Sequence, residues 1–297
     1  MRLSTLYMFK NSAENMSQRV NDNNNVYLKL SAGKSVLRAS DDPKAATDAV
    51  KYQDALAKLE LYSNVRSAAR GTLEHEDTIL SGVGNLLTTS LTEKIVAAKS
   101  ETYSDDDRKA LGAEIKGIRA NLMDLANNRD GAGRYIFGGF KTDSAPFDSA
   151  GNYVGGDVAL KQTVADGTGM QIGHIGSDVF GDIFTILDKS VEELTRDPID
   201  KSELDKALSA ASKAVSEGIE RLGKTQAELG TNLQQLDSLD LSGDVMINDT
   251  ILKIQSAIGS DYGTMTSLIM DTKMSEFALN ASMMVFQSMQ KMNLFNK

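Results

Sequence analysis

Apolar residues recur at alternating intervals of three and four residues along most of this 297-residue chain. This spacing places them on one face of a helix and is the pattern of a coiled-coil seam. The first seam comprises Leu6, Phe9, Ala13, Met16, Val20, Asn23, Tyr27 and Leu30, with a polar residue at Asn23. Because a helix with a single apolar seam is marginal alone, the sequence predicts long helices that pair with one another.

Three further seams predict helices in the body of the chain. A heptad repeat from Pro43 to about Ser100 contains Tyr52, Leu59, Arg66, Leu73, Leu80 and Leu87. A second seam, to about Asn128, contains Leu111, Ile115, Ile118, Leu122 and Leu125. A third runs from Leu204 to Leu239, and we expect Gly243 to interrupt it. The last helix is predicted from about Val245 to Phe295 and is rich in methionine.

The segment between Gly138 and Leu187 differs from the helices on either side. Glycine is frequent there, and VALKQTVADGTGMQIGHIG resembles two short strands joined by a turn at Asp166 and Gly167. The predicted fold is therefore mainly α, a coiled-coil-like helical rod formed by paired N- and C-terminal segments with a small β-rich inserted domain.

Adjacent aspartates in LRASDDPKAATDA suggest either a catalytic carboxylate pair or a helix cap. The first helix should end near Gly33, and Pro43 is suited to the first position of the next helix. Asp42 then becomes the N-cap, and Asp41 adds a negative charge at the positive end of that helix. Ser104 is a second predicted cap, before Asp105. We favour capping because no His or Lys is placed to complete a catalytic site.

Other motifs for chemistry are weak. The chain has no cysteine, which excludes disulfides and thiolate sites. The glycines of GAGRYIFGG do not match the dinucleotide fingerprint. His174 with Asp178 could contribute to a metal site, but two ligands are too few, and His75 is expected to be solvated. We therefore predict no catalytic, cofactor-binding or metal-binding residues and no enzymatic activity.

The charge distribution separates the ends of the chain from its middle. The net charge is −9, which argues against nucleic acid as a partner. Residues 1–30 sum to +2 and residues 265–297 to +1, so the middle carries −12. The methionine-rich end could pack against helices or lie on a membrane surface. We favour packing because its polar face lacks a row of Lys and Arg, and we predict no membrane partner.

Several motifs, taken in order, resemble the bacterial flagellin superfamily. RLSTLYMF, LSAGK, SDDPKAA, YSDDDRKALGAEI and LANNRDGAGRYIFGG are similar to its N-terminal half, and the chain from Ser260 onward is similar to its C-terminal half. Within the superfamily, SDDP followed by KAA, the start RLST and RYIFGG look like the proteins at the junction of hook and filament. The resemblance implies a structural junction protein, with a minor filament flagellin as the alternative.

The resemblance also implies an organisation. It suggests an inner domain of residues 1–40 and 256–297, a helical rod of residues 41–137 and 188–255, and a small outer domain of residues 138–187. The expected assembly interface is formed by Leu6, Phe9, Met16, Val20, Tyr27, Leu30, Leu268, Leu279, Met283, Phe286 and Met289.

Partners and location follow from the same resemblance. It implies export through the flagellar secretion channel to an extracellular position in the flagellum. The expected partners are further copies of this chain, the other hook–filament junction protein on the hook side, flagellin on the filament side and a cytosolic export chaperone. We also predict that both ends of the chain are disordered in the free monomer and become helical on assembly, because their apolar surface exceeds what one helix pair can bury.

Overall fold

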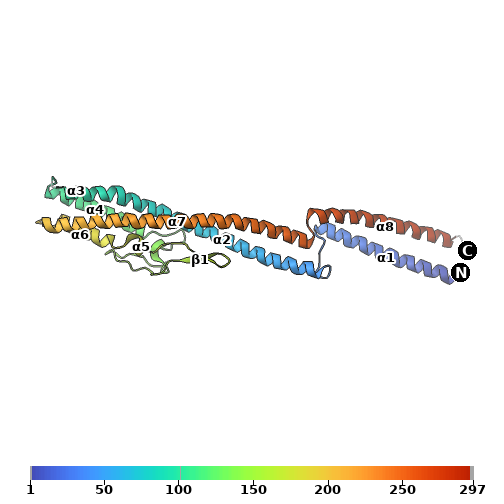
Figure 1. Cartoon of the computed structure of the whole chain (residues 1–297). Helices are drawn as coiled ribbons and strands as arrows, with labels where there is room; N and C mark the ends of the chain where they lie inside the picture. Colours follow the sequence, from blue (N-terminus) through green and yellow to red (C-terminus); the bar gives the residue numbers. More distant parts are fainter. Residues whose placement is uncertain (1, 101, 295–297) are drawn as a thin grey trace. The chain divides into compact units, whose positions relative to one another are not determined.

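The computed structural model describes residues 2–100 and 102–294, with side chains from Tyr7 to Lys291 apart from Glu101. It is mainly helical with one small sheet, as the sequence predicted (Figure 1). The chain divides into two compact units, a terminal unit of Met1–Glu60 with Asp244–Lys297 and a central unit of Leu61–Gly243. The three domains expected from the resemblance remain a prediction.

The terminal unit contains the two end helices. Helix α1 (Arg2–Ala32) and helix α8 (Tyr262–Leu294) lie side by side, and the labelled ends of the chain are at the same end of this pair (Figure 1). The start of α2 (Pro43–Asn85) and the end of α7 (Lys201–Ile258) complete the unit. The helices at the two ends of the sequence therefore pair, as the seams predicted.

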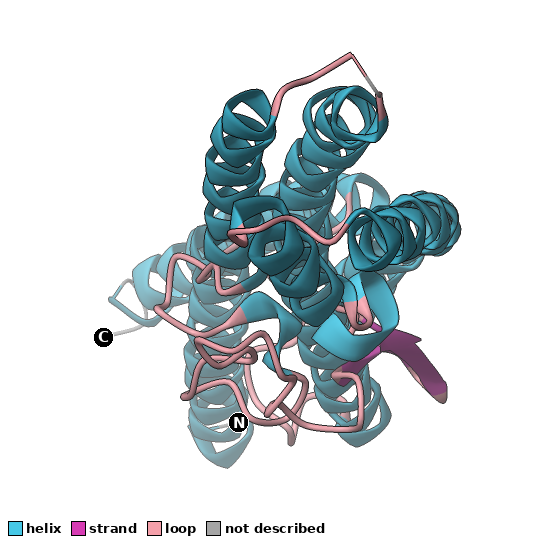
Figure 2. Ribbon diagram, turned by 90° about the vertical axis from the view of Figure 1, so that its left-hand side faces the viewer, coloured by secondary structure: helices cyan, strands magenta, loops and turns pink. Residues whose placement is uncertain are grey.

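The central unit holds the hydrophobic core. Parts of α2 and α7 are joined there by α3 (Thr92–Lys99), α4 (Asp105–Ala126) and α6 (Ile183–Thr195). The predicted seams face inward, and their buried members include Leu73, Leu80, Ile115, Leu122, Leu208, Leu229 and Leu236. Figure 2 shows these helices gathered together, with the strands and many of the loops below them in this view.

The glycine-rich segment contains the predicted hairpin. Strands β1 (Lys161–Ala165) and β2 (Thr168–Gln171) are antiparallel, and Gly167 has a φ of 69° in the turn between them. Two short helices that the sequence did not predict, η2 (Ile136–Gly138) and α5 (Gly176–Phe180), flank the hairpin in sequence. The rings of Phe137, Phe147, Phe180 and Phe184 pack against one another and attach the segment to the core.

Two features of the long helices differ from the prediction. The helix expected to end near Ser100 contains a π-helical turn, η1 (Leu86–Leu91), between α2 and α3. The expected break at Gly243 is wrong, since α7 continues through it to Ile258. One glycine inside a helix costs only about 1 kcal/mol. A Cβ at Gly243 would lie 2.6 Å from Nη2 of Arg66, so the glycine makes room for that buried guanidinium.

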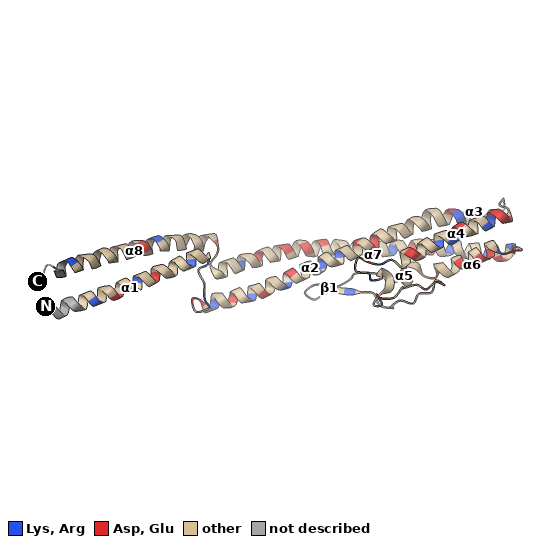
Figure 3. Cartoon of the chain, turned by 180° about the vertical axis from the view of Figure 1, so that it is seen from behind, with Lys and Arg blue, Asp and Glu red and all other residues tan. Residues whose placement is uncertain are grey.

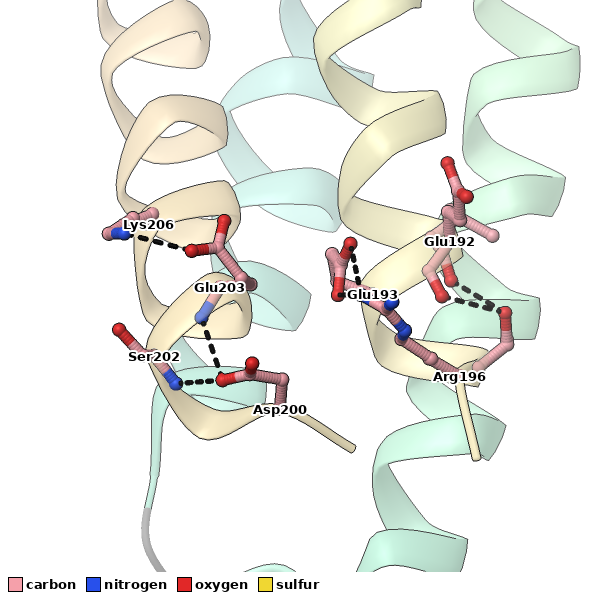
Figure 4. Close-up of polar contacts among 9 residues, drawn as sticks. Glu192, Glu193, Arg196, Asp200, Ser202, Glu203 and Lys206 are labelled. Carbon is pink, nitrogen blue, oxygen red and sulfur yellow. Dashed lines mark hydrogen bonds and ion pairs between the residues drawn. The ribbon is translucent and has the colours of Figure 1, made fainter. Parts of the chain in front are cut away.

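The connection between α6 and α7 is held by local polar contacts (Figure 4). Asp200 caps α7, because its Oδ1 accepts hydrogen bonds from the backbone N–H groups of Ser202 at 2.9 Å and Glu203 at 3.3 Å. Nη1 of Arg196 lies 3.2 Å from a carboxylate oxygen of Glu193. These contacts end one helix and begin the next within a few residues.

Candidate assembly interface

The side chains that join α1 to α8 form an inward seam on each helix. The rings of Phe9 and Phe286 have centroids 5.1 Å apart, and the Ser12 hydroxyl donates a hydrogen bond of 3.3 Å to Sδ of Met289. Leu268 is buried near the other end of the pair. Because the beginning of α1 meets the end of α8, the two helices are antiparallel.

A polar layer in the middle of this pair fixes which residues face each other. Nδ2 of the buried Asn23 donates to Oγ of Ser275 at 3.3 Å, and the Tyr27 hydroxyl donates to Oε1 of Glu276. The second bond raises the pKa of Tyr27 and lowers that of Glu276. A slip of one residue along the seam would leave Asn23 without its partner, so this layer favours one register.

A second, outward seam on α8 is exposed. Met270, Met274, Phe277 and Met284 are between 64% and 71% exposed, and they follow the same spacing as the inward seam, displaced by two positions. Two positions along a helix correspond to a rotation of about 200°, so the two seams lie on nearly opposite faces. Helix α8 is thus apolar on two sides, of which α1 covers one.

The expected interface residues differ in how far they are buried within one chain. Phe9, Met16, Leu30, Leu279, Phe286 and Met289 are half-buried, Leu268 is buried, and Val20, Tyr27 and Met283 are exposed. Leu6 lies in α1, but its side chain is outside the described part of the structure. Phe286 and Met289 contact α1, so these two residues belong to the inward seam.

The outward seam is not among the interface residues expected from the sequence. From the sequence, the methionines of the last segment were all expected to pack against helices, whereas the structure separates them onto two faces of α8. The repeated interval of four and then three residues from Met270 to Met274 and Phe277 was the available signal. Helical spacing alone does not identify which of two such seams a partner helix covers.

The joint between α1 and α2 begins with a glycine-closed helix end. The N–H of Gly33 donates to the Leu30 carbonyl and the N–H of Lys34 to the Lys29 carbonyl, both at 3.1 Å. This pair of bonds is a Schellman motif, and Gly33 adopts the positive φ of 63° that it requires. The predicted end of the first helix near Gly33 is therefore confirmed.

The joint between α7 and α8 repeats this geometry. The N–H of Gly259 donates to Ser256 and the N–H of Ser260 to Gln255, again as a Schellman motif. The backbone N–H of Ser35 donates to the Ile258 carbonyl at 3.1 Å, which links the two joints. A Cβ at Gly259 would lie 1.7 Å from Oγ of Ser35, so both φ and space require glycine there.

Aspartates begin the helices that follow both joints. Oδ1 of Asp42 accepts from the Ala45 N–H at 2.9 Å, with Pro43 as the first residue of α2. Oδ1 of Asp261 accepts from the Thr264 N–H at 3.0 Å at the start of α8. Both have the geometry of an N-cap. The chain therefore passes between helices twice by the same sequence of glycine, short loop and capping aspartate.

Asp41 has a different role from the one expected. Its Oδ2 accepts hydrogen bonds of 3.0 Å from the N–H groups of both Arg38 and Leu37, which lowers its pKa. Asp41 therefore closes the loop before α2, whereas the sequence had placed its charge at the helix end.

The second predicted cap, Ser104, lies in the central unit. The Ser104 hydroxyl accepts from the Asp107 N–H, and the Asp107 carboxylate accepts from the Ser104 N–H at 3.1 Å. This is a capping box, and the hydrogen bonds from Ser104 lower the pKa of Asp107. The carboxylates of Asp41, Asp42 and Asp107 thus all accept hydrogen bonds from backbone N–H groups, which gives them a structural explanation.

The described residues contain no group of three or more His, Cys, Asp or Glu side chains suited to a metal ion. The carboxylates beside His174 belong to Glu76 and Glu228, not to Asp178. None of the described helices is both long and apolar enough to cross a membrane. Figure 3 shows few charged residues along α8, which agrees with a surface built for helix packing.

These features define a flagellin-like protein. Residues 3–142 match the family model described as the bacterial flagellin N-terminal helical region. The fold is also that of a solved flagellar hook-associated protein 3 of Legionella pneumophila, with a TM-score of 0.61 and 17% identity over 69% of this chain and 97% of that one. Bacillus cereus FlgL gives a TM-score of 0.56 at 23% identity, covering 68% of this chain and 99% of that one.

Full-length relatives identify the family. The flagellar hook-associated protein 3 of Salmonella typhimurium is 34% identical over 318 residues, and that of Escherichia coli is 34% identical over 319 residues. Each match covers 99% of this chain and 99% of the relative. The chain belongs to the flagellar hook-associated protein 3 family. It is a structural, non-enzymatic component of the bacterial flagellum.

Proposed function

We propose that this chain forms the junction between flagellar hook and filament, as a layer of copies held together by their terminal helices. The outward seam of α8 carries this proposal. Its four large apolar side chains are exposed on a helix whose opposite face is already covered by α1. Contiguous exposed apolar surface on a soluble protein marks an interaction site.

Burial of this seam would supply the energy for assembly. Covering one Met or Phe side chain completely contributes about 1.5–3 kcal/mol. Four such side chains on one helix face can therefore drive association, whereas one chain provides no described helix to cover them. Copies of this chain in the same layer would supply the missing helices, so that completion of the fold and polymerisation become one event.

A layer between hook and filament would contact a different protein on each side. One side of the layer would contact the other junction protein on the hook, and the opposite side would contact flagellin. Before assembly, a cytosolic export chaperone would cover α8, because the exposed seam would otherwise associate too early. The chain would then leave the cell through the flagellar secretion channel and act outside it.

Deletion of the gene tests the junction role. Cells without this chain are expected to complete their hooks, to lack filaments and to release flagellin monomers into the medium, because flagellin has no layer on which to polymerise. Electron microscopy of the cells and immunoblotting of the medium measure both outcomes. Full filaments on the mutant hooks would instead support the alternative role as a minor filament flagellin.

Limited proteolysis of the free monomer tests the coupling between folding and assembly. A protease is expected to remove both ends and to leave a fragment of roughly Ala39–Gly259, since the outward seam of α8 is uncovered in one chain and Tyr7, Met8 and Leu28 of α1 are exposed. Mass spectrometry identifies the fragment. Slow amide exchange throughout α1 in dilute monomer would contradict this expectation.

A further inference from the structure

His174 lies between two carboxylates from different helices of the central unit. Its Nδ1 is 2.9 Å from Oε1 of Glu76 on α2, and its Nε2 is 3.5 Å from Oε2 of Glu228 on α7. The backbone N–H of His174 also donates to Oε1 of Glu76 at 3.1 Å. Three separate parts of the chain therefore meet at one imidazole.

Because this cluster is buried, its protonation state matters for stability. Glu76 is fully buried and His174 nearly so. The charged groups that face the imidazole are Glu76 from α2 and Glu228 from α7, and the latter also lies 3.8 Å from Lys224. A buried carboxylate without a cation is costly. No lysine or arginine contacts Glu76 among the described residues, so His174 is the group that can supply the compensating charge.

The hydrogen-bond capacity of the ring favours the same state. A neutral imidazole donates from one nitrogen only, whereas the imidazolium donates from both. Nδ1 is within hydrogen-bond distance of Glu76, whereas the buried Nε2 makes no hydrogen bond within the part of the chain that the structure describes and lies 3.5 Å from Oε2 of Glu228. The protonated ring can therefore bond to α2 and is attracted by charge to α7. Burial of the ring acts to lower the pKa of His174, but Glu76 and then Glu228 together outweigh it and raise the pKa.

Because His174 lies close to the end of β2, the cluster connects the hairpin to the long helices. It follows strand β2 by three residues, and the neighbouring Asn232 on α7 donates to the carbonyl of Gln171, the last residue of β2, at 3.1 Å. Gln171, His174, Glu228 and Asn232, with Thr231, line a cavity of about 240 Å³. The half-exposed side chain of Glu228 gives solvent protons access to the ring.

We propose that His174 is a pH-dependent latch, closed while its ring is protonated, that fastens the end of the β1–β2 hairpin to α2 and α7. A group whose pKa is higher in the folded state stabilises that state fully below its unfolded pKa. This contribution is then lost as the pH rises through the folded value. The latch therefore holds below about pH 6.5, the ordinary pKa of histidine, and opens as the pH rises through the raised folded pKa.

The two histidines of the chain make a direct measurement possible. The ring signals of the ¹⁵N-labelled full-length protein are followed by NMR from about pH 6 to about pH 9, and a His75→Gln variant assigns them. His174 is expected to titrate above about 6.5, the ordinary value of histidine. The amide signals of Gln171 and His174 should shift with the same midpoint, because the latch and the hairpin end move together.

Variants test whether His174 acts through its charge or through packing alone. Glu76→Gln keeps the shape of the side chain and should lower the His174 midpoint by about one pH unit or more, whereas Glu74→Gln, on the exposed face of the same helix, should leave it unchanged. The thermal midpoint of the wild type should fall as the pH rises through the His174 midpoint, and His174→Gln should remove that dependence.

Three results would overturn the proposal. The first is a His174 midpoint at or below about 6.5. The second is a midpoint that Glu76→Gln does not change. The third is a loss of stability in His174→Gln that is equal at every pH, which would show that the residue acts by packing alone.

Discussion

Replacement of Phe286 by Asp is expected to abolish incorporation of the chain into the flagellum. The ring packs on Phe9 at 5.1 Å, so the variant loses about 2 kcal/mol of apolar burial and places a charge in the inward seam. Once α1 separates from α8, neither helix can present its second face in register to a neighbouring copy. Electron microscopy and immunoblotting of isolated hooks measure incorporation.

Gln287→Asp is the matched control for this experiment. It adds the same charge at the next position, which lies on the polar strip of α8 with Glu276 and Asn280. This variant should assemble normally. In both variants the central unit should melt as in the wild type, because it does not contain α8. Normal incorporation of the Phe286→Asp protein would show that the α1–α8 pair is not needed for assembly.

Replacement of Asp240 by Asn should destabilise the central unit strongly. Oδ1 of Asp240 lies 2.5 Å from Nε of Arg66, whose side chain is 4% exposed. Removal of this charge leaves a buried guanidinium without a carboxylate partner among the described residues. The cost should be about 3 kcal/mol, near the lower end for broken buried pairs, because Asp240 itself is 35% exposed.

Asp237→Asn is the control on the same helix. Asp237 pairs with Arg70 at 2.7 Å but is 66% exposed, so its replacement should cost no more than about 1 kcal/mol. Urea unfolding of the full chain, followed through the central-unit transition, gives both values. Equal losses in the two variants would mean that Arg66 contributes by packing and not by its charge.

The pH dependence of the same pair has a definite sign. Burial opposes ionisation of Asp240, but hydrogen bonds from Arg66 and Arg70 outweigh it and lower the pKa of the carboxyl. A carboxyl with a lowered folded pKa contributes stability above its unfolded value of about 3.9, and this contribution is lost as the pH falls through the folded value. The difference between wild type and Asp240→Asn should therefore shrink in acid.

Local patterns in the sequence determined the long helices and the hairpin. They also determined where the first helix ends and the next one begins. Helical periodicity and capping depend on residues within one or two turns, so Asp42, Ser104 and Gly33 could be interpreted without a structure. The same local reasoning placed the seam residues Phe9 and Phe286 on apolar faces. It could not reveal that α8 has a covered and an uncovered seam, because that distinction depends on which helix packs against it.

Long-range contacts decided the remaining features. Gly243 resembles a helix break in sequence, yet the guanidinium of Arg66, far away along the chain, occupies the space beside it and the helix continues. His174 resembles a solitary histidine until the fold brings Glu76 and Glu228 to its two nitrogens. Burial, charge pairing and steric fit arise between residues distant in sequence, so only the tertiary structure could determine them.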